Sequence, residues 1–170
     1  MVIIRPECSV EYPAVYNVNL KAFNKYIEPN LVEAIRKSDN YIPELSLVAV
    51  INKAVVGHIM FSFLTIETDN GRIPVLGLAP VAVLPEHQNR GIGSALIEHG
   101  LKECKKLGFK IVILVGHPNY YPRFGFVPAG SKGLKAPFEV PDEAFMVREL
   151  IPRALTNIKG TVIHPPEFGI

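Results

Sequence analysis

The chain has no tryptophan and only two cysteines, Cys8 and Cys104. Two isolated cysteines make neither a disulfide framework nor a C-x-x-C pair, so we expect the protein in the cytosol. The chain also has little excess of charge of one sign, because 18 basic and 16 acidic residues leave a net charge of +2. Such a small net charge argues against a protein dedicated to binding nucleic acid or a membrane surface.

Long apolar runs are missing as well. No run approaches the ~20 residues that span a bilayer. The apolar start, Met1 to Pro6, is too short for the core of a signal peptide. We expect no metal site, because the cysteines are isolated and the histidines show no H-x₃₋₅-H pairing. The histidines are His58, His87, His99, His117 and His164.

The composition that remains is that of a globular protein, with 48% hydrophobic and 20% charged residues. A chain of this length removes roughly two-thirds of its unfolded surface from water and needs no disulfides to form a core. Its 170 residues predict one domain over residues 1–170.

Apolar patterning in the first half indicates a short strand, then helices, then antiparallel strands. Residues 9–38 lack strand alternation and predict one or two helices, with Pro29 between them. Asn52-Lys53 and Asn70-Gly71 lie between apolar runs and predict two hairpin turns. The expected strands are residues 2–5, 45–51, 54–66 and 73–84.

The pattern changes after Pro85. Residues 91–107 have helical spacing, with Ile97, Leu101 and Cys104 on one apolar stripe beside Ile92, Leu96 and Leu107. The following strand, residues 110–115, comes after a crossover, so two strands should run parallel. Further strands are expected at residues 144–150 and 161–163. The fold class is therefore α/β (α+β), with a mixed, mostly antiparallel sheet.

The segment Gln88-Asn89-Arg90-Gly91-Ile92-Gly93-Ser94-Ala95 lies between an apolar strand and an amphipathic helix. Two glycines at a helix start let the backbone approach a ligand. The N–H groups of the first turn lack partners inside the helix and favour an anion. The segment is therefore a candidate phosphate site, to which Arg90 could add a charged contact.

Two common phosphate-binding motifs do not fit this segment. A dinucleotide fold would have a third glycine where Leu96 stands, and an acidic residue about 20 positions later, where an apolar strand stands. A P-loop would have Gly-Lys-Ser/Thr, whereas Ser94 follows Gly93 directly. Both of these alternatives fail, and their failure weakens, without removing, a third alternative, a nucleotide-binding protein of another kind.

Gln88-x-x-Gly91-x-Gly93, after a strand that ends in Pro80-Val81-Ala82-Val83, resembles the acetyl-CoA loop of the GNAT N-acetyltransferases. Tyr121-Pro122-Arg123-Phe124-Gly125-Phe126 is similar to that family's Tyr-x-x-x-Gly-Phe. The order of elements matches over residues 1–126, and residues 127–170 add C-terminal strands and loops. The ending, residues 143–150, is similar to that of a bacterial branch of predicted N-acetyltransferases.

The resemblance implies a sheet with helices on both faces and a splayed cleft for acetyl-CoA, the cosubstrate. It implies acetyl transfer to a primary amine, with no metal, and Tyr121 as the acid for the coenzyme sulfur. Pro80 suits a bulged or open strand there, because it lacks a ladder donor. A homodimer is common in the family, but no residue here indicates one. The residues expected to bind acetyl-CoA are Val81, Ala82, Val83, Gln88, Asn89, Arg90, Gly91, Ile92, Gly93 and Ser94.

The general base and the amine acceptor are not identified by the sequence. The strand at residues 75–84 has no carboxylate, although some family members place one there. Residues 115–121 are also shorter than the common family pattern, which puts substrate contacts there in doubt. We expect the acceptor pocket among the early helices, the hairpin at residues 67–72 and the C-terminal segment. A water relay stays open as the base, as do Glu67, Glu86, His58 and His117.

A different class of function also stays open. The same fold could bind acetyl-CoA or another acyl-CoA as a sensor or structural module that transfers nothing, because a fold does not determine an activity. The feature that separates the two is an acceptor site with a usable base. Covalent catalysis is not expected, since Cys104 lies on the apolar stripe and Cys8 has no neighbouring histidine.

Overall fold

The computed structural model describes every residue from Met1 to Ile170 and divides the chain into two units. The first unit holds Met1–Ser62 and Leu78–Glu103, and the second holds Phe63–Gly77 and Cys104–Ile170. The single domain over residues 1–170 stays a prediction. The long strands β3 (Ala54–Thr68) and β4 (Gly71–Val83) have residues in both units.

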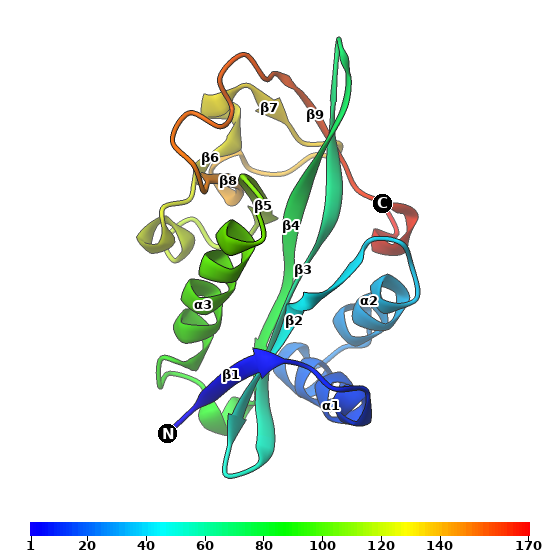
Figure 1. Cartoon of the computed structure of the whole chain (residues 1–170), viewed down its shortest axis with the longest axis vertical. Coiled ribbons are helices and arrows are strands. Elements are labelled where there is room, and N and C mark those ends of the chain that lie inside the picture. The colour runs from blue at the N-terminus through cyan, green and yellow to red at the C-terminus, as the bar shows by residue number, and fades with distance from the viewer. The chain divides into compact units, whose positions relative to one another are not determined.

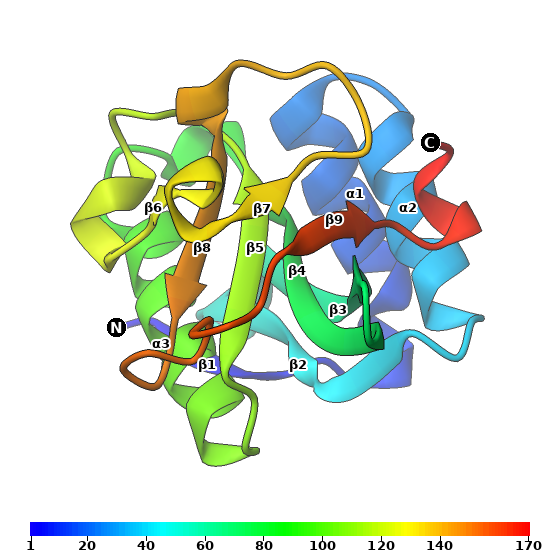
Figure 2. The same cartoon turned by 90° about the horizontal axis from the view of Figure 1, so that it is seen from above.

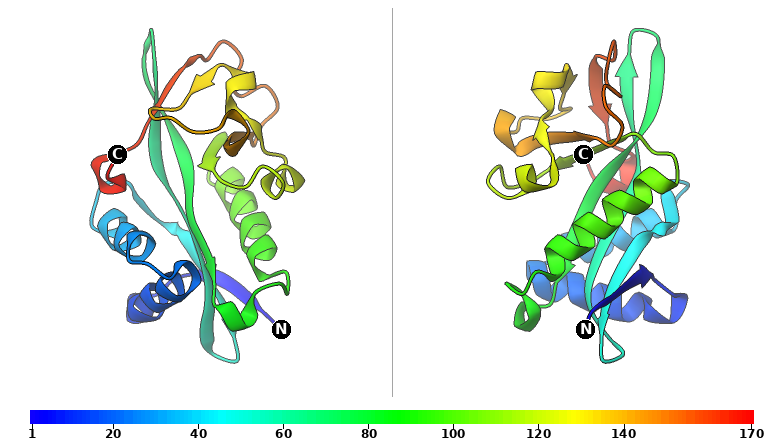
Figure 3. Two further views of the ribbon diagram at one scale, coloured as in Figure 1. Left: turned by 180° about the vertical axis from the view of Figure 1, so that it is seen from behind. Right: turned by 60° about the vertical axis from the view of Figure 1, so that its left-hand side comes forward.

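The first unit is built on an antiparallel sheet in the order β1-β2-β3-β4. Figure 1 shows α1 and α2 on one side of these strands and α3 on the other, and both views in Figure 3 agree. The predicted helices on both faces of the sheet are therefore present. Besides parts of β3 and β4, this unit contains β1 (Ile3–Pro6), α1 (Tyr12–Phe23), α2 (Ile27–Arg36), β2 (Tyr41–Ile51) and most of α3 (Ile92–Lys106).

Local backbone chemistry explains two features of the first unit. The turn between β2 and β3 is the predicted Asn52-Lys53, and both residues have positive φ, 47° and 67°, as a tight two-residue hairpin requires. Gly100 of α3 lies against Phe61 of β3, where an added Cβ would come within 2.4 Å of the ring. A side chain at position 100 would therefore push α3 away from the sheet.

The break between α1 and α2 is not where the sequence predicts it. α1 ends at Phe23, and the capping residue Asn24 has a φ of 53° and donates its N–H to Leu20 O at 2.8 Å. Pro29 lies inside the first turn of α2 instead of between the helices. A proline is tolerated there because the first-turn N–H groups have no partner in the helix.

The second unit continues the sheet with one parallel pair. β4 pairs with β5 through Leu76–Val112 and Gly77–Ile113, and this confirms the predicted crossover. β5 and β6 each pair antiparallel with β8, and β9 pairs with the end of β3. Figure 2 shows β5 beside β8 and β7 beside β9. The strands are β5 (Ile111–Val115), β6 (Val127–Pro128), β7 (Leu134–Lys135), β8 (Phe145–Glu149) and β9 (Gly160–Ile163).

The mixed, mostly antiparallel sheet is thus confirmed, with three differences in the second half of the chain. Leu107 lies beyond the end of α3 and is 45% exposed, so its place on the apolar stripe was wrong. The strands β6 and β7 were not predicted, because two residues carry no periodicity. The parallel pairing of β7 with β9 was also missed. None of the helices is long and apolar enough to cross a membrane.

Candidate functional site

The loop before α3 is exposed and has a backbone that favours glycine. Residues 88–91 are exposed, and Asn89 and Gly91 have φ values of 62° and 82°. An L side chain rarely adopts such values, whereas glycine and asparagine do. The Gln88 amide donates a hydrogen bond to Val83 O at 2.9 Å, which ties the loop to the end of β4.

The start of α3 has the geometry of an anion site. Its first regular hydrogen bond runs from Ala95 N to Gly91 O at 3.0 Å. The N–H groups of Ile92 and Gly93 precede that bond, so neither has an acceptor inside the helix. An added Cβ at Gly91 would have no atom within 4 Å, so the space beside the helix start is open. A phosphate group fits these residues, because the N-terminal end of a helix favours negative charge.

The end of β4 supplies the second group of predicted binding residues. Val81 and Val83 are half-buried, while Ala82 between them is 3% exposed, as the alternation of a strand requires. The ladder to β5 consists of the pairs at Leu76 and Gly77 and so ends before Pro80. Pro80 follows a cis peptide bond after Ala79. Its missing N–H therefore removes no hydrogen bond from that ladder.

Tyr121 belongs to the second unit and lies in a cluster of aromatic rings. Its ring centroid is 5.1 Å from that of Tyr120, 6.4 Å from that of Phe124 and 6.0 Å from that of Phe126. A Cβ added to Gly116 would come within 2.5 Å of the Tyr121 ring, so a glycine is needed there for this packing. The motif residues Tyr121 and Phe126 thus belong to the same aromatic cluster.

Electrostatics keep Tyr121 protonated. Burial, with a smaller contribution from the neighbouring Tyr120, raises the pKa of Tyr121 to about 12. Its phenol is therefore a hydrogen-bond donor throughout the neutral range. The structure places this donor in the second unit, and the loop and β4 residues above in the first.

His58, one of the candidate bases, is fully buried in the first unit. Its Nδ1 lies 3.2 Å from Asn19 Nδ2, which also donates to Val15 O, so Nδ1 accepts. Its Nε2 lies 3.0 Å from Ser46 Oγ and carries the proton. A residue enclosed in this way cannot reach a substrate amine, so we assign His58 to the core. The sequence analysis missed this cluster, although Ser46 inside the apolar run of β2 was a signal.

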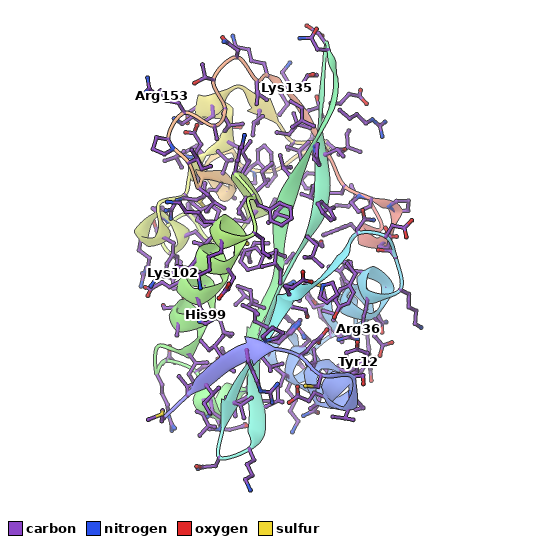
Figure 4. All side chains as sticks on the ribbon, in the orientation of Figure 1. Tyr12, Arg36, His99, Lys102, Lys135 and Arg153 are labelled. Atoms are coloured by element: carbon purple, nitrogen blue, oxygen red, sulfur yellow. The ribbon has the colours of Figure 1, made fainter.

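A buried ion pair lies beside this cluster. Arg36 donates two hydrogen bonds to Glu7, at 2.9 and 3.2 Å, and its guanidinium lies 3.7 Å from the centroid of the Tyr12 ring. Figure 4 labels Tyr12 and Arg36 where α1 and α2 meet. The Glu7 N–H donates to Ser46 O at 2.9 Å, which joins the pair to the histidine cluster. These contacts hold α2 to β1 and β2.

His58 is expected to make the protein less stable in acid. Burial lowers its pKa to about 4, whereas an unfolded histidine has about 6.5. Below about pH 6.5 the unfolded chain therefore binds a proton that the folded chain does not. The free energy of unfolding then decreases as the pH is lowered. Between about pH 7.5 and about pH 4 this loss is about 3 kcal/mol. Urea unfolding of the wild type and of His58→Gln across this range measures it.

A control variant and a second measurement separate the contribution of His58 from that of the carboxylates, which also titrate in this range. His117→Gln, at an exposed position, should keep the wild-type dependence, while His58→Gln should lose about 3 kcal/mol of it. If His58→Gln does not fold, the imidazole NMR signals of the wild-type protein serve instead. A His58 signal that titrates near pH 6.5 would contradict the assignment.

The other candidate bases are exposed residues on loops or strand ends. Glu67, one residue before the end of β3, forms an exposed ion pair with Arg72 at 3.2 Å, and Glu86 lies in a short 3₁₀ turn. His117 follows β5 and is exposed. No group of three or more His, Cys, Asp or Glu residues could hold a metal ion. The base therefore stays unassigned, with a water relay among the candidates.

Comparison with known proteins identifies a family. The family model for the acetyltransferase (GNAT) domain matches residues 4–129. The uncharacterized N-acetyltransferase YjhQ of Escherichia coli (strain K12) is 36% identical over 146 residues, which are 84% of this chain and 81% of the relative. The uncharacterized N-acetyltransferase YhbS of the same strain is 28% identical over 168 residues, 98% of each chain.

Two solved structures share the fold over nearly the whole chain. The crystal structure of the GNAT family N-acetyltransferase YhbS from Escherichia coli in complex with CoA has a TM-score of 0.91 and 26% identity, and covers 99% of this chain and 92% of that one. A GNAT family acetyltransferase from Brucella melitensis in complex with acetyl-CoA has a TM-score of 0.81 and 29% identity, and covers 99% and 98%. Because the family model covers well over half of the sequence, the chain belongs to the GNAT family of N-acetyltransferases, as its glycine loop and tyrosine motif predict.

Proposed function

We propose that the protein binds acetyl-CoA and transfers the acetyl group directly to a primary amine. The observation that carries the proposal is the start of α3 behind the exposed loop at residues 88–91, where Gly91 has positive φ and the N–H groups of Ile92 and Gly93 have no acceptor within the helix. Support comes from the E. coli and Brucella melitensis proteins, which were crystallized with CoA and acetyl-CoA.

The binding residues divide between the loop and the end of β4. The N–H groups of Gly91 to Ser94 hold the pyrophosphate, and Gln88 keeps the loop on β4 through its bond to Val83 O. The exposed Arg90 and Asn89 add polar contacts at its edge. The amides of Val81 and Val83 pair with the pantetheine arm as with an added strand, while Ala82 packs into the core.

Transfer needs a neutral amine, a polarised thioester carbonyl and a donor for the departing sulfur. The amine nitrogen attacks the carbonyl carbon, the carbon–sulfur bond breaks, and the amine loses its proton to a base. An amide near Val81 stabilises the oxyanion, and Tyr121 donates a hydrogen bond to the sulfur. Cys104 is fully buried, and the exposed Cys8 has no neighbouring histidine in the sequence, which favours direct transfer over an acyl-enzyme. The cytosolic location and a homodimer stay predictions.

Acetyl-CoA is expected to raise the temperature of unfolding. At a ligand concentration near 100 times the dissociation constant, binding to the folded state alone adds about 2.7 kcal/mol. For a chain of this length that is a rise of roughly 5–11 °C. Scanning calorimetry with acetyl-CoA measures it, with ATP and NAD as controls. Thiol release from acetyl-CoA in the presence of mixed amines then separates an enzyme from a binding protein.

A pair of glycine variants ties the effect to the loop. Gly91→Val puts a branched side chain at a φ of 82° beside the helix start, and Gly71→Val imposes the same kind of strain at a φ of 117° in the β3–β4 turn. Both should lower stability, but only Gly91→Val should abolish the acetyl-CoA shift. Equal shifts in the two variants, or none in the wild type, would refute the assignment of the loop.

A further inference from the structure

A cavity of about 1100 Å³ lies within the second unit. It is lined by the end of β3, by β7 and the loop that leads from it to β8, and by the start of β9. Figure 2 shows β7 and β9 side by side, with that loop arching away from them. The cavity is large enough for a small organic ligand, for which pockets of about 300–1,000 Å³ are usual.

The floor of the cavity carries a row of three polar side chains. Thr161 of β9 lies opposite Glu67 of β3 on one side and opposite Lys135 of β7 on the other. Residues paired across strands point to the same face of a sheet, and all three line the cavity. A carboxylate, a hydroxyl and an ammonium therefore stand in line. Lys135 is labelled in Figure 4.

Charges of both signs line the cavity. Glu67 is bonded to Arg72 at 3.2 Å. The carboxylates of Asp69, Glu139 and Asp142 and the ammonium groups of Lys135 and Lys159 also line the cavity. A ligand with only positive or only negative charge would be attracted by one set and repelled by the other. A ligand with both charges satisfies the two sets together.

Apolar side chains form part of the remaining lining, beside the hydroxyls of Thr68 and Ser131. Leu134 and Phe145 belong to the buried core and are 3% and 4% exposed, and both line the cavity, as do Phe138 and Val140 of the loop. Alkyl groups of a ligand can leave water against these side chains. The lining thus suits a molecule with a short hydrocarbon chain that ends in a zwitterionic head.

We propose that this cavity binds the acceptor, and that the acceptor is a zwitterion of the amino-acid class that carries its reacting amine on an alkyl chain. Lys135 and Lys159 hold its carboxylate, and Glu139 and Asp142 hold its second ammonium. The inference rests on the proposed acetyl transfer and names the class of its acceptor. A free basic amino acid and a short peptide share this chemistry.

Four acceptors with the same reacting amine test the head group. L-lysine has both head charges, 1,5-diaminopentane lacks the carboxylate, 6-aminohexanoate lacks the ammonium, and pentylamine lacks both. We expect kcat/KM to be about tenfold higher for each charge present, which is the effect of about 1.4 kcal/mol. Glycyl-lysyl-glycine, compared with lysine, distinguishes a peptide from a free amino acid.

Variants connect each charge to its residues. Lys135→Met should reduce the preference for acceptors that have a carboxylate and leave the ratio of 1,5-diaminopentane to pentylamine unchanged. Glu139→Gln with Asp142→Asn should do the reverse. Glu143→Gln is the matched control, because Glu143 is an exposed neighbour of Asp142 that does not line the cavity. It should behave as the wild type.

Calorimetric titration of lysine into the protein keeps this test separate from the proposed function. Acetyl transfer with equal kcat/KM for all four amines would overturn the acceptor assignment and leave the acetyltransferase intact. If no amine is acetylated, the proposed transfer fails, and lysine binding that Lys135→Met and Glu139→Gln/Asp142→Asn weaken still supports the cavity as a zwitterion site. Absence of binding in both assays would overturn it.

Discussion

Replacing Glu7 by alanine is expected to lower the free energy of unfolding by about 3–5 kcal/mol. The Glu7 side chain is fully buried. Its carboxylate accepts two hydrogen bonds from Arg36 and a third from the Tyr41 hydroxyl at 2.7 Å. Without the carboxylate, the guanidinium of Arg36, 9% exposed, keeps its charge in a site with no counter-ion. Thermal unfolding should show a fall in the midpoint of about 6–20 °C.

An exposed ion pair provides the control. Glu67→Ala removes the partner of Arg72, but these side chains are 54% and 63% exposed, so the expected loss is below about 1 kcal/mol. Replacing both buried partners, as in Glu7→Leu with Arg36→Met, should recover part of the loss, because no charge is then left in the core. If the Glu7→Ala protein were as stable as the Glu67→Ala protein, water would have to solvate the Arg36 guanidinium in the variant, and the predicted loss would be wrong.

Most of the fold could be predicted because its signals are local. The turn at Asn52-Lys53 needs positive φ, the helix from Ile92 shows its apolar stripe, and the β-branched run at residues 111–115 is a buried strand. Pairings between distant segments carry no such signal. The pairing of β9 with the end of β3 joins residues about 95 positions apart, and the sequence of neither segment indicates its partner.

The candidate site divides in the same way. The glycine loop and the tyrosine motif were found through their resemblance to the GNAT family. In the structure, the positive φ of Gly91 and the close approach of Gly116 to the Tyr121 ring are physical reasons for glycine at these two positions. The acceptor pocket expected among the early helices, the hairpin at residues 67–72 and the C-terminal segment stays a prediction, although parts of the last two line the cavity over β7 and β9. Its mixed charges come from four segments, so no sequence window contains them.

The buried cluster around His58 shows why a histidine in a sequence is hard to assign. Its polar neighbours, Asn19 and Ser46, lie in a helix and a strand that are otherwise apolar where they are buried. Only the fold shows that both ring nitrogens are already engaged. A neutral, enclosed imidazole supports the core, so the base for acetyl transfer must be sought among exposed residues or water.

Tyr121→Phe is expected to lower kcat about 100- to 1000-fold, as removal of one donor to a developing charge does. The dissociation constant of acetyl-CoA should stay within about twofold, because the hydroxyl acts on the sulfur only as the thioester breaks. The aromatic packing on Gly116, Phe124 and Phe126 is retained by phenylalanine, so stability should change little. Stopped-flow or steady-state assays with the identified acceptor measure kcat, and calorimetry measures binding.

The raised pKa of Tyr121 bears on whether its phenol transfers a proton to the sulfur or only donates a hydrogen bond. A thiol has a pKa of about 8.5, so complete proton transfer from a phenol of pKa about 12 is unfavourable by about 3.5 pKa units. We therefore propose that Tyr121 stabilises the developing thiolate by a hydrogen bond and keeps its own proton. Because the pKa is raised, ionisation of Tyr121 should cause no loss of rate as the pH rises to about 10.

The pH dependence and a neighbouring variant test this role together. Tyr120→Phe removes the adjacent hydroxyl, whose ring is 5.1 Å away, and should keep kcat within a few-fold of the wild type. The wild-type rate should not decline between about pH 8 and about pH 10, whereas a tyrosine with the ordinary pKa of about 10 would begin to show a descending limb there. If Tyr121→Phe turns over as fast as the wild type, the developing thiolate is stabilised without it, and water or the ammonium formed from the acceptor must donate the hydrogen bond instead.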